Sequence, residues 1–166
     1  MKFASIVSAI TLGTALLTPA AWAQQKLDTA HSEVQFTARQ MGVPLDGQFK
    51  KFDAQVAFDP AKLAASKITF SVDTGSATLG SKETDAELPK AVWFNVPKFP
   101  QATFESSSIK ALGGGKFEVA GKLNIKGVSS DVVVPVTLAQ NGAQTVATGA
   151  FPIKRLTFRI GEKEWS

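Results

Sequence analysis

The sequence predicts a single-domain, all-β protein with antiparallel strands and one short helix, and three observations lead to this fold class. Apolar residues recur at every second position through most of the chain, which is typical of strands with one buried and one solvated face. Glycine-rich and Asn-Gly turns separate several of these runs and indicate hairpins. The 143 residues that follow residue 23 suffice for one domain with a real core and are too few for two ordinary ones.

The N-terminus predicts a signal peptide over residues 1–23. Lys2 precedes an uncharged run of apolar and small residues over 3–17, and Ala-Trp-Ala at 21–23 fits a cleavage site. The apolar run is about 15 residues long, which is too short for a comfortable membrane span. We therefore expect export and a mature domain of residues 24–166, with an N-terminal anchor helix as the alternative.

Alternating runs predict the strands in order along the chain. The third run, for example, places Ile68, Phe70 and Val72 on one face. Gly113-Gly114-Gly115 predicts the hairpin between the fourth and fifth runs, and Asn141-Gly142 predicts the hairpin between the sixth and seventh. The eight runs are 34–38, 52–58, 68–72, 102–109, 117–125, 132–138, 144–153 and 156–160.

Only one stretch predicts a helix, residues 81–88. Ser81 is a good N-cap, acidic residues at 83, 85 and 87 suit a helix N-terminus, and Pro89 ends or kinks the helix. Residues 59–66 predict one further turn. Many short strands with little helix leave two architectures open, a sandwich and an up-and-down barrel.

Composition excludes several kinds of site. The chain has no cysteine, so neither a disulfide nor a thiolate metal site can form, and a single histidine, His31, excludes a multi-histidine metal site within one chain. Without Lys2, 17 basic and 14 acidic residues remain, scattered along the sequence. That distribution argues against nucleic-acid binding and favours an ordinary solvated surface, with a weak, transient attraction to anionic membranes as the alternative.

The aromatic residues indicate an apolar interior. The sequence has twelve phenylalanines and no tyrosine, so most of its rings bury without a polar atom to satisfy. In a barrel of about eight strands, such an interior is filled by side chains or holds a small ligand. The residues alone leave both alternatives open.

Asp28, His31 and Ser32 are the residue types of a catalytic triad. In an extended segment, Asp28 and Ser32 would lie roughly 13 Å apart at about 3.3 Å per residue, too far for hydrogen bonds around one histidine. We therefore expect a structural His31–Ser32 pair at the start of a strand, no catalytic residues and no enzyme.

Six sequence blocks follow one another in a characteristic order: Asp28-x-x-His31-Ser32-x-Val34-x-Phe36, Met41-Gly42, Gly47-x-Phe49, Phe58-Asp59, Phe99-Pro100-x-Ala102-Thr103-Phe104 and Gly121-x-Leu123-x-Ile125-x-Gly127-Val128. This order resembles the YceI-like family of periplasmic polyisoprenoid-binding proteins. The resemblance implies a lipocalin-like antiparallel barrel in the bacterial periplasm. It implies that the partner inside is a long isoprenoid lipid, a polyprenyl or quinone-type chain, and that neither cofactor nor catalysis is involved.

On this resemblance we expect an apolar lining with polar residues near the mouth. The alternative is a structural or stress-related protein whose core is filled and binds no lipid, and Trp93 and Phe94 alternatively form a plug beneath the helix. The expected lining is Phe36, Phe52, Phe58, Phe70, Trp93, Phe94, Phe104, Phe117 and Leu123, and the expected mouth residues are His31, Arg39 and Arg155.

The sequence departs from the family pattern in two places. In the helical segment only Asp85 and Leu88 correspond to the family's Arg-Asp and His-Leu pairs, so a polar head-group contact from the missing residues is not implied. The sequence also stops at Ser166, where relatives continue into a final strand. We therefore expect a C-terminally truncated product or fragment whose barrel is incompletely closed, or a sheet completed in a homodimer.

Overall fold

The computed structural model describes residues 25–40 and 42–162. The predicted signal peptide at 1–23 lies outside the described residues. The described chain forms two antiparallel sheets, and the all-β prediction is confirmed. The larger sheet has seven strands in the spatial order β1 (Gln25–Lys26), β4 (Phe52–Ala57), β5 (Lys67–Asp73), β7 (Gln101–Gly113), β8 (Lys116–Ile125), β9 (Val128–Asn141) and β10 (Gln144–Gly149). The smaller sheet has the order β2 (Val34–Gln40), β3 (Val43–Phe49) and β6 (Ala77–Thr78).

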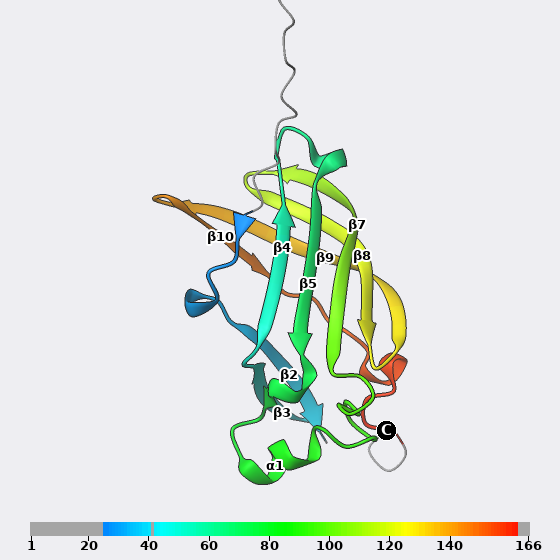
Figure 1. Ribbon diagram of the computed structural model, residues 1–166. Coiled ribbons are helices and arrows are strands. Elements are labelled where there is room, and N and C mark those ends of the chain that lie inside the picture. The colour runs from blue at the N-terminus through cyan, green and yellow to red at the C-terminus, as the bar shows by residue number, and fades with distance from the viewer. Residues whose placement is uncertain (1–24, 41, 163–166) are drawn as a thin grey trace, which may run out of the picture.

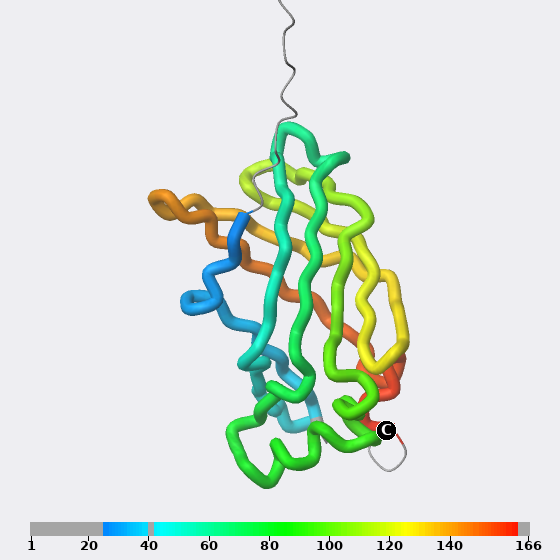
Figure 2. Tube along the Cα trace, in the orientation of Figure 1, coloured from blue at the N-terminus to red at the C-terminus, as the bar shows by residue number. Residues whose placement is uncertain are grey.

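The seven-stranded sheet curls into an open half-barrel. Figure 1 shows β9 and β10 passing behind β4 and β5, so one face of the sheet becomes concave. Within the described residues, β1 and β10 are the two edges, and the sheet does not close on itself. The tube in Figure 2 follows the chain from β10 across the back of the molecule to the C-terminal turn. The architecture is that of an open lipocalin-like barrel, as predicted.

Both predicted hairpins are confirmed. β7 and β8 pair through the glycine triplet, whose three residues have φ angles of 87°, 60° and 76°. β9 and β10 pair through the Asn141-Gly142 turn, where Gly142 has a φ of 61°. Glycine reaches these left-handed angles without the steric cost that a Cβ brings, which is why the sequence indicated the turns.

The predicted helix is also present, as α1 (Lys82–Glu87), with Ser81 as N-cap and Leu88 as C-cap. The turn expected over 59–66 forms as the 3-10 helix η2 (Leu63–Ala65). Two further 3-10 turns are η1 (Thr29–His31) and η3 (Thr74–Ser76). Among the described residues, no helix is long and apolar enough to cross a membrane.

The predicted strand over 156–160 is wrong. The segment forms the 3-10 helix η4 (Arg155–Phe158), after which Arg159 takes a left-handed φ of 55°. The Arg155 guanidinium draws the chain back, because its Nη1 donates to the carbonyl oxygens of Ile160 at 2.9 Å and Gly161 at 2.8 Å. The apolar spacing that suggested a strand instead buries Phe158 and Ile160 on one side of this turn.

One strand end and three additional strands also differ from prediction. The seventh run was expected to reach Ile153, but β10 ends at Gly149. Three strands were not predicted, and two of them, β1 and β6, have only two residues each. The third, β3, contains Pro44 and Gly47, which weaken a strand pattern, yet it pairs along its whole length with β2.

The buried core lies at the α1 end of the half-barrel. It joins the strand ends nearest α1 to the helix itself, to the loop that follows α1 and to η4. Its buried members are Val72, Ala77, Leu88, Phe94, Ala102, Ile125, Phe158 and Ile160. Lys126 holds this end together, because its buried ammonium donates to the carbonyl oxygens of Arg159 at 2.5 Å and Val92 at 3.3 Å. Burial lowers the pKa of Lys126.

The Asp85 carboxylate connects α1 to β6, and its bonds make the protein less stable when the pH becomes strongly acidic. Its carboxylate accepts from the Thr78 hydroxyl at 2.6 Å and from the Leu79 N–H at 2.6 Å. These bonds, the Thr78 bond first, lower the pKa of Asp85 below its ordinary value of 3.8. Because the pKa is lower in the folded state, this stabilisation is complete above pH 3.8 and is lost as the pH falls through the folded-state pKa.

We expect Asp85→Asn to lower the melting temperature at pH 7 by several degrees, and we expect the difference from wild type to shrink below pH 4 as the wild-type carboxylate takes up a proton. Thermal unfolding followed by circular dichroism from pH 7 to pH 2.5 measures this. Thr78→Val removes one of the same bonds from the other side and should lose part of the same pH dependence. A constant difference between wild type and Asp85→Asn at every pH would contradict the assignment.

Candidate functional site

The concave side of the half-barrel, here called the inner face, is an apolar surface that crosses the strands. Cross-strand partners in an antiparallel sheet point to the same side, so the register defines which side chains share this face. One row runs across five strands through Ala54, Phe70, Phe104, Leu123 and Ser130. Each residue of this row is only half-buried.

Buried residues lie on both sides of that row. Toward α1, the inner face continues into the core through Val72 and Ala102. Toward the opposite end, Ile109 and Val119 form a cross-strand pair and are 9% and 3% exposed. Partly exposed apolar side chains therefore lie between these two buried groups, and they continue beyond Val119 at Phe117 and Val136.

The structure places five of the predicted lining residues on the inner face. The strand register places their side chains on the same side of the sheet. The rings of Phe52 and Phe70 are stacked with centroids 6.2 Å apart. These five are Phe52, Phe70, Phe104, Phe117 and Leu123. Phe58, just beyond β4, makes an edge-on contact with Phe117 at 5.3 Å and extends the surface.

Three other predicted lining residues lie elsewhere. Phe36 belongs to the smaller sheet, where its ring lies 5.2 Å from that of Phe49. Phe94 is buried in the core, and its N–H donates to the carbonyl oxygen of Leu88, the residue that ends α1. Trp93 lies beside Gly161 of the C-terminal turn. Phe94 thus packs against the helix end, as the plug interpretation has it.

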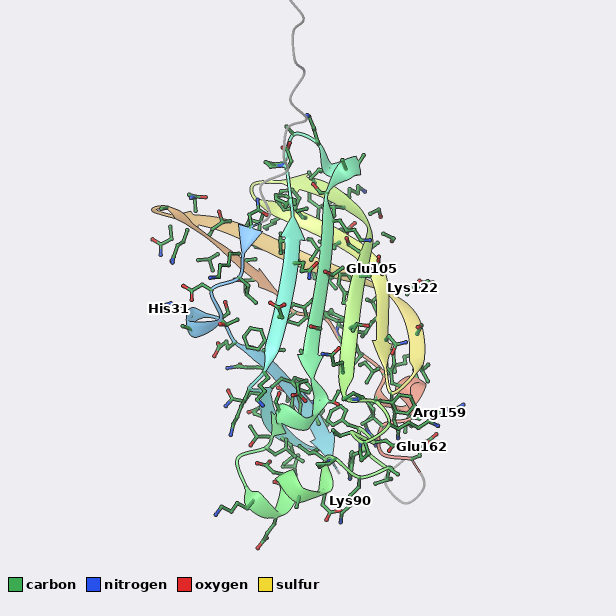
Figure 3. The ribbon with its side chains drawn as sticks, viewed as in Figure 1. His31, Lys90, Glu105, Lys122, Arg159 and Glu162 are labelled. Carbon is green, nitrogen blue, oxygen red and sulfur yellow. The ribbon has the colours of Figure 1, made fainter. Side chains whose placement is uncertain are left out.

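The three predicted mouth residues are not brought together. His31 lies in η1, ahead of β2, whereas Arg39 lies near the far end of that strand. Arg155 is part-buried in η4 and bonded to the carbonyl oxygens of the C-terminal turn. Figure 3 shows His31 and the η4 region, marked by Arg159, on opposite sides of the molecule. These residues therefore do not form one polar rim.

The Asp28–His31–Ser32 segment is a turn, so the expectation of an extended segment is wrong. The 3-10 turn brings the His31 Nδ1 to 2.9 Å from the Asp28 carboxylate, and the hydrogen bond to His31 lowers the pKa of Asp28. The Ser32 hydroxyl donates to the Asp28 carbonyl oxygen at 2.7 Å. The hydroxyl is thus engaged with the backbone and not with the imidazole, which is the arrangement of a structural turn.

The convex outer face of the same sheet is polar. A shallow hollow of about 290 Å³ lies over β4, β5 and β7, bordered by Asp53, Ser71 and Thr103. Exposed ion pairs join Lys67 to Glu105 at 2.6 Å and Lys122 to Asp131 at 2.9 Å, and Figure 3 labels Glu105 and Lys122. Such exposed pairs contribute little to stability, and this face is a solvated surface.

Some of the sequence blocks that resemble the family contact one another in the structure, through a phenylalanine ring of one block and a glycine of another. A Cβ placed on Gly47 would lie 2.4 Å from the Phe36 ring, and one placed on Gly121 would lie 2.6 Å from the Phe104 ring. In both pairs, a ring from one block covers the bare backbone of another. Both glycines lie inside strands, so they are required for close approach and not for turns.

The family model for the YceI-like domain matches residues 25–165. The chain belongs to this family. Its curated relatives include a UPF0312 protein of Azotobacter vinelandii, 35% identical over 141 residues, which cover 82% of this chain and 73% of the relative. Protein YceI of Salmonella arizonae is 35% identical over 137 residues, covering 80% of this chain and 71% of the relative.

Two solved structures share the fold of this chain. The crystal structure of Burkholderia cenocepacia BcnA is 48% identical, with a TM-score of 0.79, and the match covers 83% of this chain and 87% of that one. A polyisoprenoid-binding domain from Saccharophagus degradans has a TM-score of 0.62 at 14% identity, covering 82% of this chain and 79% of that one. The second likeness is one of fold alone.

Ser130 is an inner-face residue that sequence reasoning missed. The sixth predicted run began at Val132, whereas β9 begins at Val128. The same two-residue period continues through Val128, Ser130 and Val132, but serine is polar, so the apolar alternation is interrupted at this position. The family's glycine and valine at 127 and 128 were the available signal that the strand starts earlier.

Proposed function

We propose that this YceI-like protein binds a long isoprenoid lipid, a polyprenyl or quinone-type chain, non-covalently on the inner face of its half-barrel. The observation that carries the proposal is the row through Phe70, Phe104 and Leu123. These large apolar side chains face the concave side and remain half-buried, although a filled core would cover them. A hydrocarbon chain laid on this face would complete their burial.

The energetics of burial support this proposal. Transfer of one CH₂ group out of water contributes about 0.8 kcal/mol, so one five-carbon unit contributes up to roughly 4 kcal/mol. Ordering costs on association are about 4 to 15 kcal/mol. A few isoprenoid units in contact with the inner face therefore suffice for stable binding, and polar contacts mainly select the head group.

Two further observations agree with carriage of a lipid. The Saccharophagus domain that shares the fold is described as polyisoprenoid-binding. The sequence of residues 1–23 predicts export, which for a bacterial chain of this family leads to the periplasm. We propose the periplasm as the place of function, where a free long-chain isoprenoid is insoluble without a carrier.

The test is lipid binding by the mature chain and by two matched variants. Phe104→Asp places a charge on the inner face, and Thr103→Asp places the same charge on the adjacent outer-face position, which is exposed. We expect Phe104→Asp to weaken binding of geranylgeraniol at least tenfold, because a carboxylate would have to be desolvated against the lipid, and Thr103→Asp to leave it within about twofold. Titration calorimetry measures the affinities, and circular dichroism checks folding.

Phe70→Ala serves as a second inner-face variant if Phe104→Asp does not fold. Native mass spectrometry of the purified wild-type chain, followed by organic extraction, asks whether an isoprenoid co-purifies. If no lipid co-purifies in repeated preparations and none binds on titration, the half-barrel is a structural or stress-related module with no lipid ligand, and the proposal fails.

A further inference from the structure

Two hydroxyls interrupt the inner face formed by β4, β5, β7, β8 and β9. They belong to Ser106 on β7 and Ser130 on β9, and both residues are half-buried. Ser130 pairs with Leu123 across the β8–β9 ladder, which fixes its side chain on the inner side. Its neighbours Ser129 and Asp131 are exposed on the outer side, so the alternation of exposure agrees with the register.

The two serines differ in their hydrogen bonds. The Ser106 hydroxyl accepts from the Ile68 N–H at 2.8 Å and so continues the β5–β7 ladder. The Ser130 hydroxyl has no hydrogen-bond partner among residues 25–40 and 42–162. On the outer side, Ser129 accepts from the Asn124 amide at 2.9 Å. No fully buried side-chain polar atom of the described residues lacks a partner, so the Ser130 hydroxyl is open to solvent in the ligand-free protein. A lipid laid over the inner face would displace that solvent and would itself have to supply the hydrogen bond.

Ser130 also lies at a boundary. The next inner-face pair toward α1 is Ile125 with Val128, and Ile125 is buried in the core at 8% exposure. The next pair away from α1 is Gly121 with Val132, on the part of the sheet where apolar side chains remain half-buried. A lipid on the inner face would therefore meet the Ser130 hydroxyl where the filled core begins.

We propose that Ser130 is a specificity-determining residue that forms a hydrogen bond with an uncharged oxygen of the bound isoprenoid, a prenyl hydroxyl or a quinone carbonyl. This inference rests on the proposed function. A serine hydroxyl both donates and accepts, so either oxygen type satisfies it. The bond would orient the lipid with its oxygen-bearing end toward the core and its hydrocarbon along the Phe104 row.

The surroundings favour an uncharged oxygen over a phosphate. Within the described strands of the larger sheet, the inner-face positions carry no lysine or arginine. The buried cation at the β8–β9 turn, Lys126, already donates to two carbonyl oxygens. A diphosphate bound beside Ser130 would lose its water without gaining a cation, whereas phosphate sites are built from arginine, lysine or several backbone N–H groups.

The experiment compares three probes that share one tail: geranylgeraniol, geranylgeranyl diphosphate and the hydrocarbon of the same chain. Wild type should bind the alcohol about threefold to tenfold more tightly than the hydrocarbon, the factor that one neutral hydrogen bond contributes. Ser130→Ala should lower affinity for the alcohol by that factor and leave affinity for the hydrocarbon unchanged. Ser129→Ala is the matched control, because that hydroxyl faces outward, and it should behave as wild type.

The outcomes separate this inference from the function on which it rests. If wild type binds none of the probes, the proposed function itself fails. If it binds alcohol and hydrocarbon equally, or if Ser130→Ala keeps the preference for the alcohol, lipid binding stands and the role of Ser130 is overturned. Tightest binding of the diphosphate would also overturn it. Circular dichroism of each variant shows whether a loss of affinity reflects unfolding.

Discussion

Replacing Phe158 by alanine is expected to lower the free energy of unfolding by about 3–5 kcal/mol, the usual cost of deleting a fully buried aromatic ring. Phe158 is 2% exposed and is the largest of the fully buried side chains among the described residues. It joins η4 to the core at the α1 end. For a domain of this size, the melting temperature should fall by about 10 °C or more. Urea titration and thermal melts measure both quantities.

Leu156→Ala is the matched control for this prediction. Leu156 lies in the same 3-10 turn but is 47% exposed, so its truncation should cost less than about 1 kcal/mol. If the two variants lose the same stability, η4 does not pack on the core as described. If neither loses stability, the C-terminal turn contributes nothing to folding of the half-barrel.

The contrast between these two residues explains why sequence reasoning succeeded over most of the fold and failed at its end. Along β8, five inner positions alternate over ten residues with five outer positions, four of which are polar, and this two-residue period over that length is typical of a strand. Around Phe158, only three apolar residues alternate. A short turn buries two of them as readily as a strand does, and the side-chain bonds of Arg155 decide the outcome.

The candidate site was predictable to the extent that it follows from strand register. Phe70, Phe104 and Leu123 were assigned to one face by parity, and antiparallel pairing places them side by side. The mouth was not predictable, because His31, Arg39 and Arg155 belong to segments whose directions depend on turns. A guanidinium in a sequence gives no sign of whether it faces a ligand or, as Arg155 does, its own carbonyls.

Gly121→Ala is expected to destabilise the fold by about 3 kcal/mol, the upper part of the range for overpacking. A Cβ at this position would lie 2.3 Å from the carbonyl oxygen of Glu105 and 2.6 Å from the Phe104 ring. The carbonyl belongs to the neighbouring strand β7 and moves only with the strand. The β7–β8 ladder would therefore have to separate locally. Chemical unfolding measures the loss, and amide exchange along β7 and β8 shows where pairing weakens.

A control and a double variant identify which contact makes this glycine necessary. Gly142→Ala meets no atom within 4 Å and changes only a left-handed turn, so it should cost about 1 to 2 kcal/mol. Gly121→Ala combined with Phe104→Leu removes the ring contact but leaves the carbonyl contact. Little recovery in the double variant would mean that backbone approach dictates the glycine, and full recovery would mean that the ring does. Because Phe104 and Gly121 come from separate sequence blocks of the family, full recovery would also explain why the two blocks occur together.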